Sequence, residues 1–76
     1  MKEILEAIIK SLVQDRDSIS IKETTNEKAV NYEVKVAATD MGRVIGRQGR
    51  VAKAIRSIMK AMAAKEHKRI NIEFID

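Results

Sequence analysis

The residues best suited to binding a ligand lie in the stretch Val44–Arg50, which reads Val-Ile-Gly-Arg-Gln-Gly-Arg. All three glycines of the chain, Gly42, Gly46 and Gly49, fall between residues 42 and 49. Glycine permits positive φ angles and a close approach of the backbone to a ligand, so the permissive backbone of the chain is concentrated here. Backbone N–H groups exposed at the start of a following helix would form a site for an anion.

Positively charged side chains surround these glycines. They are Arg43, Arg47, Arg50, Lys53 and Arg56, and between residues 40 and 56 they are opposed by a single acid, Asp40. This excess of positive charge favours phosphate as the anion, either free or in a nucleic-acid backbone. The alternative is that the same side chains simply form a solvated helix face.

The residue types needed for catalysis or metal binding are largely missing. The chain has no cysteine, which excludes disulfides and thiolate metal sites, and its one histidine is His67. Near a helix end, His67 is better explained as a partner of the helix dipole than as a catalytic group. No carboxylates cluster beside the glycines to hold Mg²⁺, and no Lys-Ser or Lys-Thr follows Gly49, as a P-loop would require. We therefore expect no enzyme, no cofactor and no metal site.

Length and charge set the broad class of the protein. Its 76 residues form one domain, residues 1–76, and the formal net charge of +4 favours a polyanionic partner. The longest apolar run near the N-terminus, Ala7–Ile9, is far too short for a signal peptide or a membrane span. We expect a cytoplasmic protein with no membrane association.

The first half of the chain predicts a helix followed by a hairpin. Apolar residues recur at helical spacing over Lys2–Gln14, so this segment should pack one face on a sheet. Ser18–Lys22 alternates as a strand does, Thr24–Lys28 is a polar turn region, and Ala29–Thr39 predicts a long second strand. In that strand the side chains expected to face the core are Val30, Tyr32, Val34, Val36 and Ala38.

The second half predicts the elements that would carry the glycines. Asp40 is expected to cap a short helix over Met41–Ile45. Gly46–Gly49 should form a tight turn into a longer helix over Arg50–Lys65, and Arg69–Ile75 predicts a final strand. The buried residues of the longer helix are predicted to be Ile55, Ile58, Met59 and Met62, and those of the last strand Ile70, Ile72 and Phe74. The class is α+β, with a three-stranded mixed sheet covered on one face by helices.

A bare G-x-x-G pattern is weak, but its context here resembles the KH domain. The segment 40–50, Asp-Met-Gly-Arg-Val-Ile-Gly-Arg-Gln-Gly-Arg, is similar to the core KH signature, and the element order α-β-β-α-α-β is similar to the type II, prokaryotic arrangement. The size of the chain and the stretch from Gly42 to Arg56 resemble the small stand-alone bacterial RNA-binding proteins of the KhpA family.

The resemblance implies an RNA-binding groove. The loop between the two glycines would clamp about four single-stranded nucleotides by their backbone. Ile45, Val51 and the second strand would offer an apolar wall to the bases. The resemblance further implies post-transcriptional regulation or RNA chaperone activity in bacteria, and a second KH-containing protein as a partner. The expected RNA-binding residues are Gly42, Arg43, Val44, Ile45, Gly46, Arg47, Gln48, Gly49, Arg50, Lys53 and Arg56.

Two other functions stay open at this point. Two glycines three residues apart also occur in helix-turn-helix DNA-binding proteins, although the predicted strands argue against that class. The second alternative is a protein-interaction or assembly module whose positive charge is incidental.

The helix predicted over Arg50–Lys65 has more apolar surface than one sheet contact requires. At ~100° per residue its apolar residues cover roughly 200°, about twice the stripe needed to cover a sheet. The excess lies either toward Ala54, Ile58 and Ala61 or toward Ala52, Met59 and Ala63. We expect it to form a symmetric dimer or a heterodimer with another KH protein. The expected interface residues are Ala54, Ile58, Met59, Ala61 and Met62.

Overall fold

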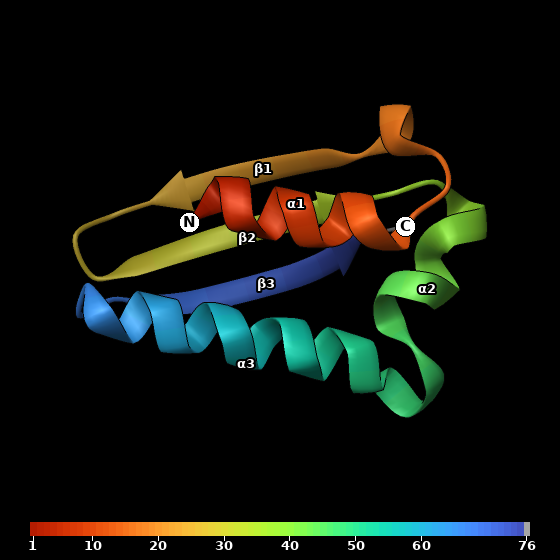
Figure 1. Ribbon diagram of the computed structural model, residues 1–76. Helices are drawn as coiled ribbons and strands as arrows, with labels where there is room; N and C mark the ends of the chain where they lie inside the picture. The colour runs from red at the N-terminus through yellow and green to blue at the C-terminus, as the bar shows by residue number, and fades with distance from the viewer. Residues whose placement is uncertain (76) are drawn as a thin grey trace.

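Three strands form one mixed sheet in the computed structural model, which describes residues 1–75 (Figure 1). They are β1 (Ser20–Thr25), β2 (Ala29–Lys35) and β3 (Arg69–Ile75). The sheet order is β1-β2-β3, with β1 antiparallel and β3 parallel to the central β2. The predicted mixed sheet is confirmed; Asp76, which closes the predicted domain, lies outside the described residues.

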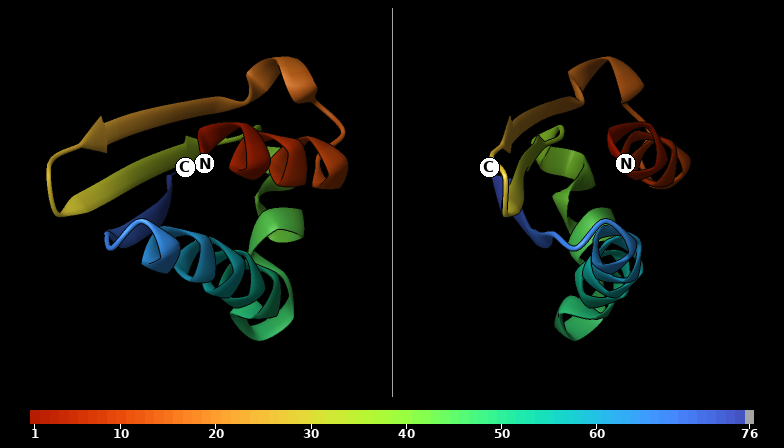
Figure 2. Two further views of the ribbon diagram at one scale, coloured as in Figure 1. Left: turned by 60° about the vertical axis from the view of Figure 1, so that its left-hand side comes forward. Right: turned by 90° about the vertical axis from the view of Figure 1, so that its left-hand side faces the viewer.

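Three α-helices cover one face of this sheet, as Figure 2 shows in the view along the strands. They are α1 (Lys2–Leu12), α2 (Met41–Ile45) and α3 (Arg50–Lys65). Short 3₁₀ turns at Arg16–Ser18, Ala38–Asp40 and Arg47–Gly49 connect the elements. The predicted order α-β-β-α-α-β and the predicted covering of one sheet face by helices are both confirmed.

The core lies between the sheet and the helices because apolar residues alternate on the strands and recur at helical spacing on α1 and α3. On β2 and just after it, Val30, Tyr32, Val34 and Val36 are buried as predicted, and Ile72 is the fully enclosed residue of β3. The helices contribute Leu5, Ile9, Val44, Ala52, Ile55, Met59 and Ala63. Burial, and next the neighbouring Glu23 carboxylate, raise the pKa of the Tyr32 phenol above its ordinary value.

The first strand of the hairpin lies further along the chain than predicted, and the turn is shorter. β1 begins at Ser20 rather than Ser18 and continues to Thr25, which pairs with Val30. The turn shrinks to residues 26–28, where the Asn26 side-chain oxygen accepts the N–H groups of Lys28 and Ala29 at 2.9 and 2.8 Å. The second half of β1 is exposed on both faces, so no apolar alternation could reveal it.

The buried face of α3 differs from the predicted one. Ile55 and Met59 are buried as expected, but Ile58 is 49% exposed and Met62 is only partly buried. Ala52 and Ala63 take their places against the sheet. At ~100° per residue the buried residues share one face of the helix, and Ile58 lies about 100° from the centre of that face.

Candidate nucleic-acid interface

The loop between α2 and α3 requires glycine at its first position. Gly46 has φ 76° and ψ 171°, a combination that is essentially restricted to glycine. A Cβ atom on Gly46 would lie 2.4 Å from Cγ2 of Val51 and 2.8 Å from its backbone nitrogen. The Gly46 N–H donates to the Gly42 carbonyl at 2.9 Å and closes α2. The backbone here is therefore fixed by close packing of the loop on the first turn of α3.

The rest of the GXXG loop (Gly46–Gly49) turns the chain sharply into α3. Gly49 has φ 74°, and Gln48 is also left-handed at φ 57°. The Gly49 N–H donates to the Gly46 carbonyl at 3.1 Å. No described side chain caps the N-terminus of α3, where the Arg50 N–H donates to the Arg47 carbonyl. The positive end of the α3 dipole therefore lies beside the loop, as an anion site needs.

The predicted cations divide into two groups. Arg47, Arg50 and Lys53 are exposed on the loop and the first turn of α3, as is Gln48. Arg43 is half exposed, but its Nε lies 3.5 Å from Oδ1 of Asp40, which offsets part of its charge. Arg56 is partly buried against β3 and is described below. The exposed group forms the positive field expected around the loop.

The apolar wall differs from the prediction in two respects. Val44, expected to contact RNA, is completely buried in the core, whereas Ile45 and Val51 are partly exposed. The second strand cannot form the wall, because β2 is the central strand and its apolar side chains are enclosed. The strand that packs beside α3 is β3, at the edge of the sheet.

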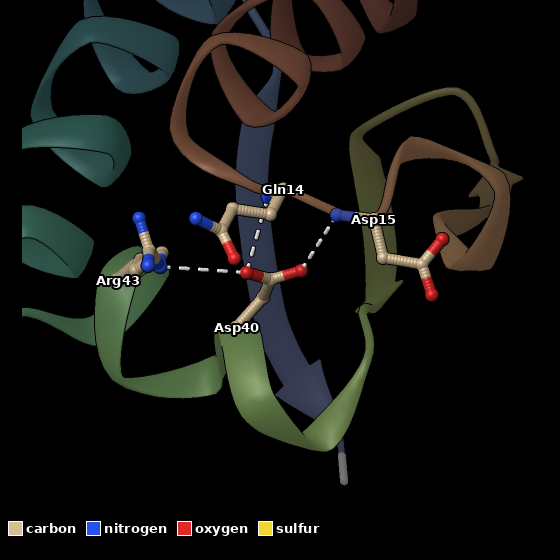
Figure 3. Close-up of polar contacts among 4 residues, drawn as sticks. All are labelled: Gln14, Asp15, Asp40 and Arg43. Atoms are coloured by element: carbon tan, nitrogen blue, oxygen red, sulfur yellow. Dashed lines mark hydrogen bonds and ion pairs between the residues drawn. The ribbon is translucent and has the colours of Figure 1, made fainter.

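Asp40 holds the junction from which α2 begins (Figure 3). Its carboxylate is buried and accepts the backbone N–H groups of Asp15 at 3.0 Å and Gln14 at 3.1 Å. These bonds, Asp15 first, with Arg43 alongside, hold the pKa of Asp40 below its ordinary range. Asp40 occupies the predicted N-cap position of α2, but the predicted side-chain cap is wrong, because its carboxylate forms no hydrogen bond with α2. The residue instead ties the end of α1 to the element that carries the GXXG loop.

The same junction explains two misplaced boundaries. The helix predicted to Gln14 ends at Leu12, because Val13 is extended and the next two N–H groups turn toward Asp40. The strand predicted to Thr39 ends at Lys35, and Ala38, expected in the core, is exposed in the 3₁₀ turn before Asp40.

A seam between α3 and β3 adds Lys60, Lys68 and Arg69 to the cations predicted from the sequence. Arg56, Lys60, Ile70, Asn71 and Ile72 line a hollow of about 130 Å³ in this α3–β3 seam. Lys68 and Arg69 line a neighbouring hollow, again with Lys60 and Ile70. Lys60 lies one turn after Arg56 and could have been included from helical spacing. Lys68 and Arg69 could not, because they follow the end of α3 and their place beside Lys60 depends on how β3 packs against the helix.

Of the predicted dimer residues, Ala54, Ile58 and Ala61 are exposed and Met62 is partly exposed. Met59 is completely buried in the core, so it is not available to a partner and that assignment is wrong. The excess apolar surface of α3 is therefore the Ala54, Ile58 and Ala61 side, and the Ala52, Met59 and Ala63 side packs on the sheet.

Two negative findings apply to residues 1–75. No helix there has both the length and the apolar character of a membrane span. No three His, Asp or Glu side chains of these residues gather into a group that could hold a metal ion.

Comparison with known proteins covers nearly the whole chain. A family model described as "KhpA/KhpB, KH domain" matches residues 2–74. RNA-binding protein KhpA of Clostridium acetobutylicum is 53% identical over 75 residues, covering 99% of this chain and 100% of that protein. The Clostridium perfringens protein of the same name is 48% identical with the same coverage. That of Aquifex aeolicus is 38% identical over 76 residues, covering 100% of this chain and 96% of the relative.

Proposed function

The chain belongs to the KhpA/KhpB KH-domain family, and on this basis we propose that it binds single-stranded RNA and performs no chemistry. The observation that carries the proposal is the GXXG loop, whose Gly46 is required by its φ angle and by contact with Val51. Relatives of the same length are named RNA-binding proteins, which supports this ligand. The loop clamps the backbone of about four nucleotides, as KH loops do.

Some residues near the loop contact the phosphates of the RNA, and others contact its bases. Backbone N–H groups at the start of α3 and the guanidinium of Arg47 contact phosphate oxygens. Arg50 and Lys53, both exposed, add the surrounding positive field. Ile45 and Val51, partly exposed, provide an apolar surface beside the bases. Because phosphate contacts dominate, affinity falls steeply as salt rises.

A salt titration tests this function against its rivals. Fluorescence anisotropy of a labelled single-stranded RNA is measured at 50 and 200 mM salt, with single-stranded and duplex DNA of the same sequence in parallel. We expect saturable binding to single strands that weakens at the higher salt. Absence of saturable binding at both salt concentrations would favour a protein-interaction module. Tighter binding to duplex DNA would favour a helix-turn-helix mode.

In the cell we propose that the protein acts in the bacterial cytoplasm as a post-transcriptional regulator or RNA chaperone. Support comes from the family alone. Crosslinking the protein to RNA in cells and sequencing the recovered RNA tests this role. Recovery of no RNA above an uncrosslinked control would contradict it.

We also propose that the chain self-associates through the outer stripe of α3, defined as Ala54, Ile58, Ala61 and Met62. Ile58 is 49% exposed, and alanines beside it allow two helices to approach closely. A two-fold axis across this stripe gives a closed dimer. In sedimentation at high micromolar concentration we expect a dimer for the wild type and a monomer for Ile58→Asp. A wild-type monomer under these conditions would leave a second KH protein as the partner.

A further inference from the structure

Arg56 is held in one place by two contacts on β3. Its Nε donates to the backbone carbonyl of Ile72 at 3.2 Å. Its guanidinium carbon lies 5.5 Å from the ring centroid of Phe74, within the range of a cation–π contact. The side chain is only partly exposed. An arginine fixed in this way presents its planar group in a defined orientation.

Most of the hydrogen-bonding capacity of Arg56 is left over. A guanidinium has five N–H donors, and the contact to Ile72 uses the one on Nε. Among residues 1–75 no acidic side chain forms an ion pair with it. Arg56 also lines the 130 Å³ hollow of the α3–β3 seam, with Ile70 and Ile72 as its apolar members. The hollow therefore combines an aliphatic surface with the positively charged, fixed guanidinium of Arg56.

The hollow is in line with the GXXG loop. At ~100° per residue, Gly49, Lys53, Arg56 and Lys60 lie within about 60° of one another on the surface of α3. At ~1.5 Å per residue, Arg56 is about 9 Å along the helix axis from Arg50. A nucleic-acid strand whose backbone is held at the loop can thus extend along this stripe and place a base at the hollow.

We propose that the α3–β3 seam is a nucleobase subsite selective for guanine, with Arg56 as its specificity-determining residue. The proposal rests on the RNA-binding function proposed above. Guanine presents two acceptors, O6 and N7, which match two terminal guanidinium N–H groups. Adenine presents an amino donor where guanine has O6. A fixed guanidinium would therefore place one of its N–H donors against the adenine amino group, with no hydrogen bond between them. A phosphate contact would instead raise affinity for every sequence equally.

The test compares RNAs that differ in one purine atom or group. Anisotropy titrations use three eight-nucleotide RNAs: alternating G and U, alternating A and U, and alternating 7-deazaguanine and U, which lacks the N7 acceptor. For the wild type we expect the guanine RNA to bind about 5-fold or more tighter than the adenine RNA. The 7-deaza RNA should lose most of that preference, and this comparison needs no variant protein.

Variants then assign the preference to Arg56. Arg56→Met should bind guanine and adenine RNAs equally, because it keeps a long aliphatic side chain and removes every N–H donor. The control Lys53→Gln should weaken both RNAs equally and keep their ratio. Equal wild-type binding of the guanine and adenine RNAs, or a ratio retained in Arg56→Met, would overturn the subsite while leaving RNA binding intact. Failure of the wild type to bind any of the three RNAs would overturn both proposals.

Discussion

Reversing the charge of the GXXG loop should abolish most RNA binding without unfolding the protein. The change is Arg47→Asp together with Gln48→Asp. Both side chains are exposed, and neither takes part in any hydrogen bond or ion pair recorded among residues 1–75. Gln48 has φ 57°, a conformation that aspartate tolerates better than most residues. The free energy of unfolding should therefore change by only about 0.5 kcal/mol.

The effect on binding follows from Coulomb's law. The loop side chains change from +1 to −2, a difference of three charge units. At ~6 Å from one phosphate in water, each unit contributes about 0.7 kcal/mol, so three units contribute about 2 kcal/mol. Screening at 0.1 M salt roughly halves this for one phosphate, and a second phosphate beside the loop restores it. We expect binding to weaken about 30-fold, and more if Arg47 also loses a direct contact.

The assay is an anisotropy titration of one single-stranded RNA at one salt concentration, with circular dichroism of both proteins. The matched control is Lys2→Asp with Ala7→Asp, which changes the charge by the same three units on exposed positions of α1. The control should bind within about 2-fold of wild type. If the loop variant stays folded and also binds within about 2-fold of wild type, the GXXG loop is not the phosphate clamp.

Two further predictions concern residues that hold the GXXG loop in place, Gly46 and Asp40. Gly46→Ala should lower the free energy of unfolding by about 1–3 kcal/mol and weaken RNA binding, because the new Cβ would meet Val51 and φ is 76°. Gly42→Ala, at a helical position with open space around it, should be neutral or stabilising. Equal stability of the two variants in chemical denaturation would contradict this reasoning. Asp40→Asn should lower stability at neutral pH, since an amide offers one acceptor group where two backbone N–H groups now bind. The pKa of Asp40 is lowered on folding, so its contribution is present above the unfolded value of about 4 and is lost as pH falls through the folded one. The thermal midpoint of the wild type should therefore approach that of Asp40→Asn in acid, and a constant difference down to pH 2 would refute the role of its charge.

The sequence predicted the elements that have strong periodicity. α3 and β3 begin and end where expected, because a long amphipathic helix and an alternating strand each bury one face. The GXXG loop was also found, since glycines concentrated in one place mark unusual backbone. The prediction was least accurate at the ends of the helices and strands. His67 closes α3 in a left-handed conformation at φ 58°, a role that glycine usually fills and that no local pattern indicated.

The remaining errors come from contacts between distant residues. Asp40 bonds to Gln14 and Asp15, which lie 26 and 25 residues earlier in the chain, so a local capping rule assigned its carboxylate to the wrong partner. Arg56 was identified as a cation, but its fixation by Ile72 and Phe74 depends on β3 packing beside α3. Sequence spacing indicated which residues could bind; only the fold indicates how each one is held.

The division of α3 into three faces would let one helix contribute to the core, to the proposed RNA site and to the proposed dimer. Met59 is fully buried, whereas the preceding residue, Ile58, is 49% exposed. At ~100° per residue, every residue of the outer stripe is separated by about 120° or more from Arg56. A second copy packed on the outer stripe therefore leaves the α3–β3 seam open. In the proposed dimer two loops act on one RNA at once, and their phosphate contacts combine. Binding that is weak for one domain then becomes effective for the pair, because the second contact is intramolecular.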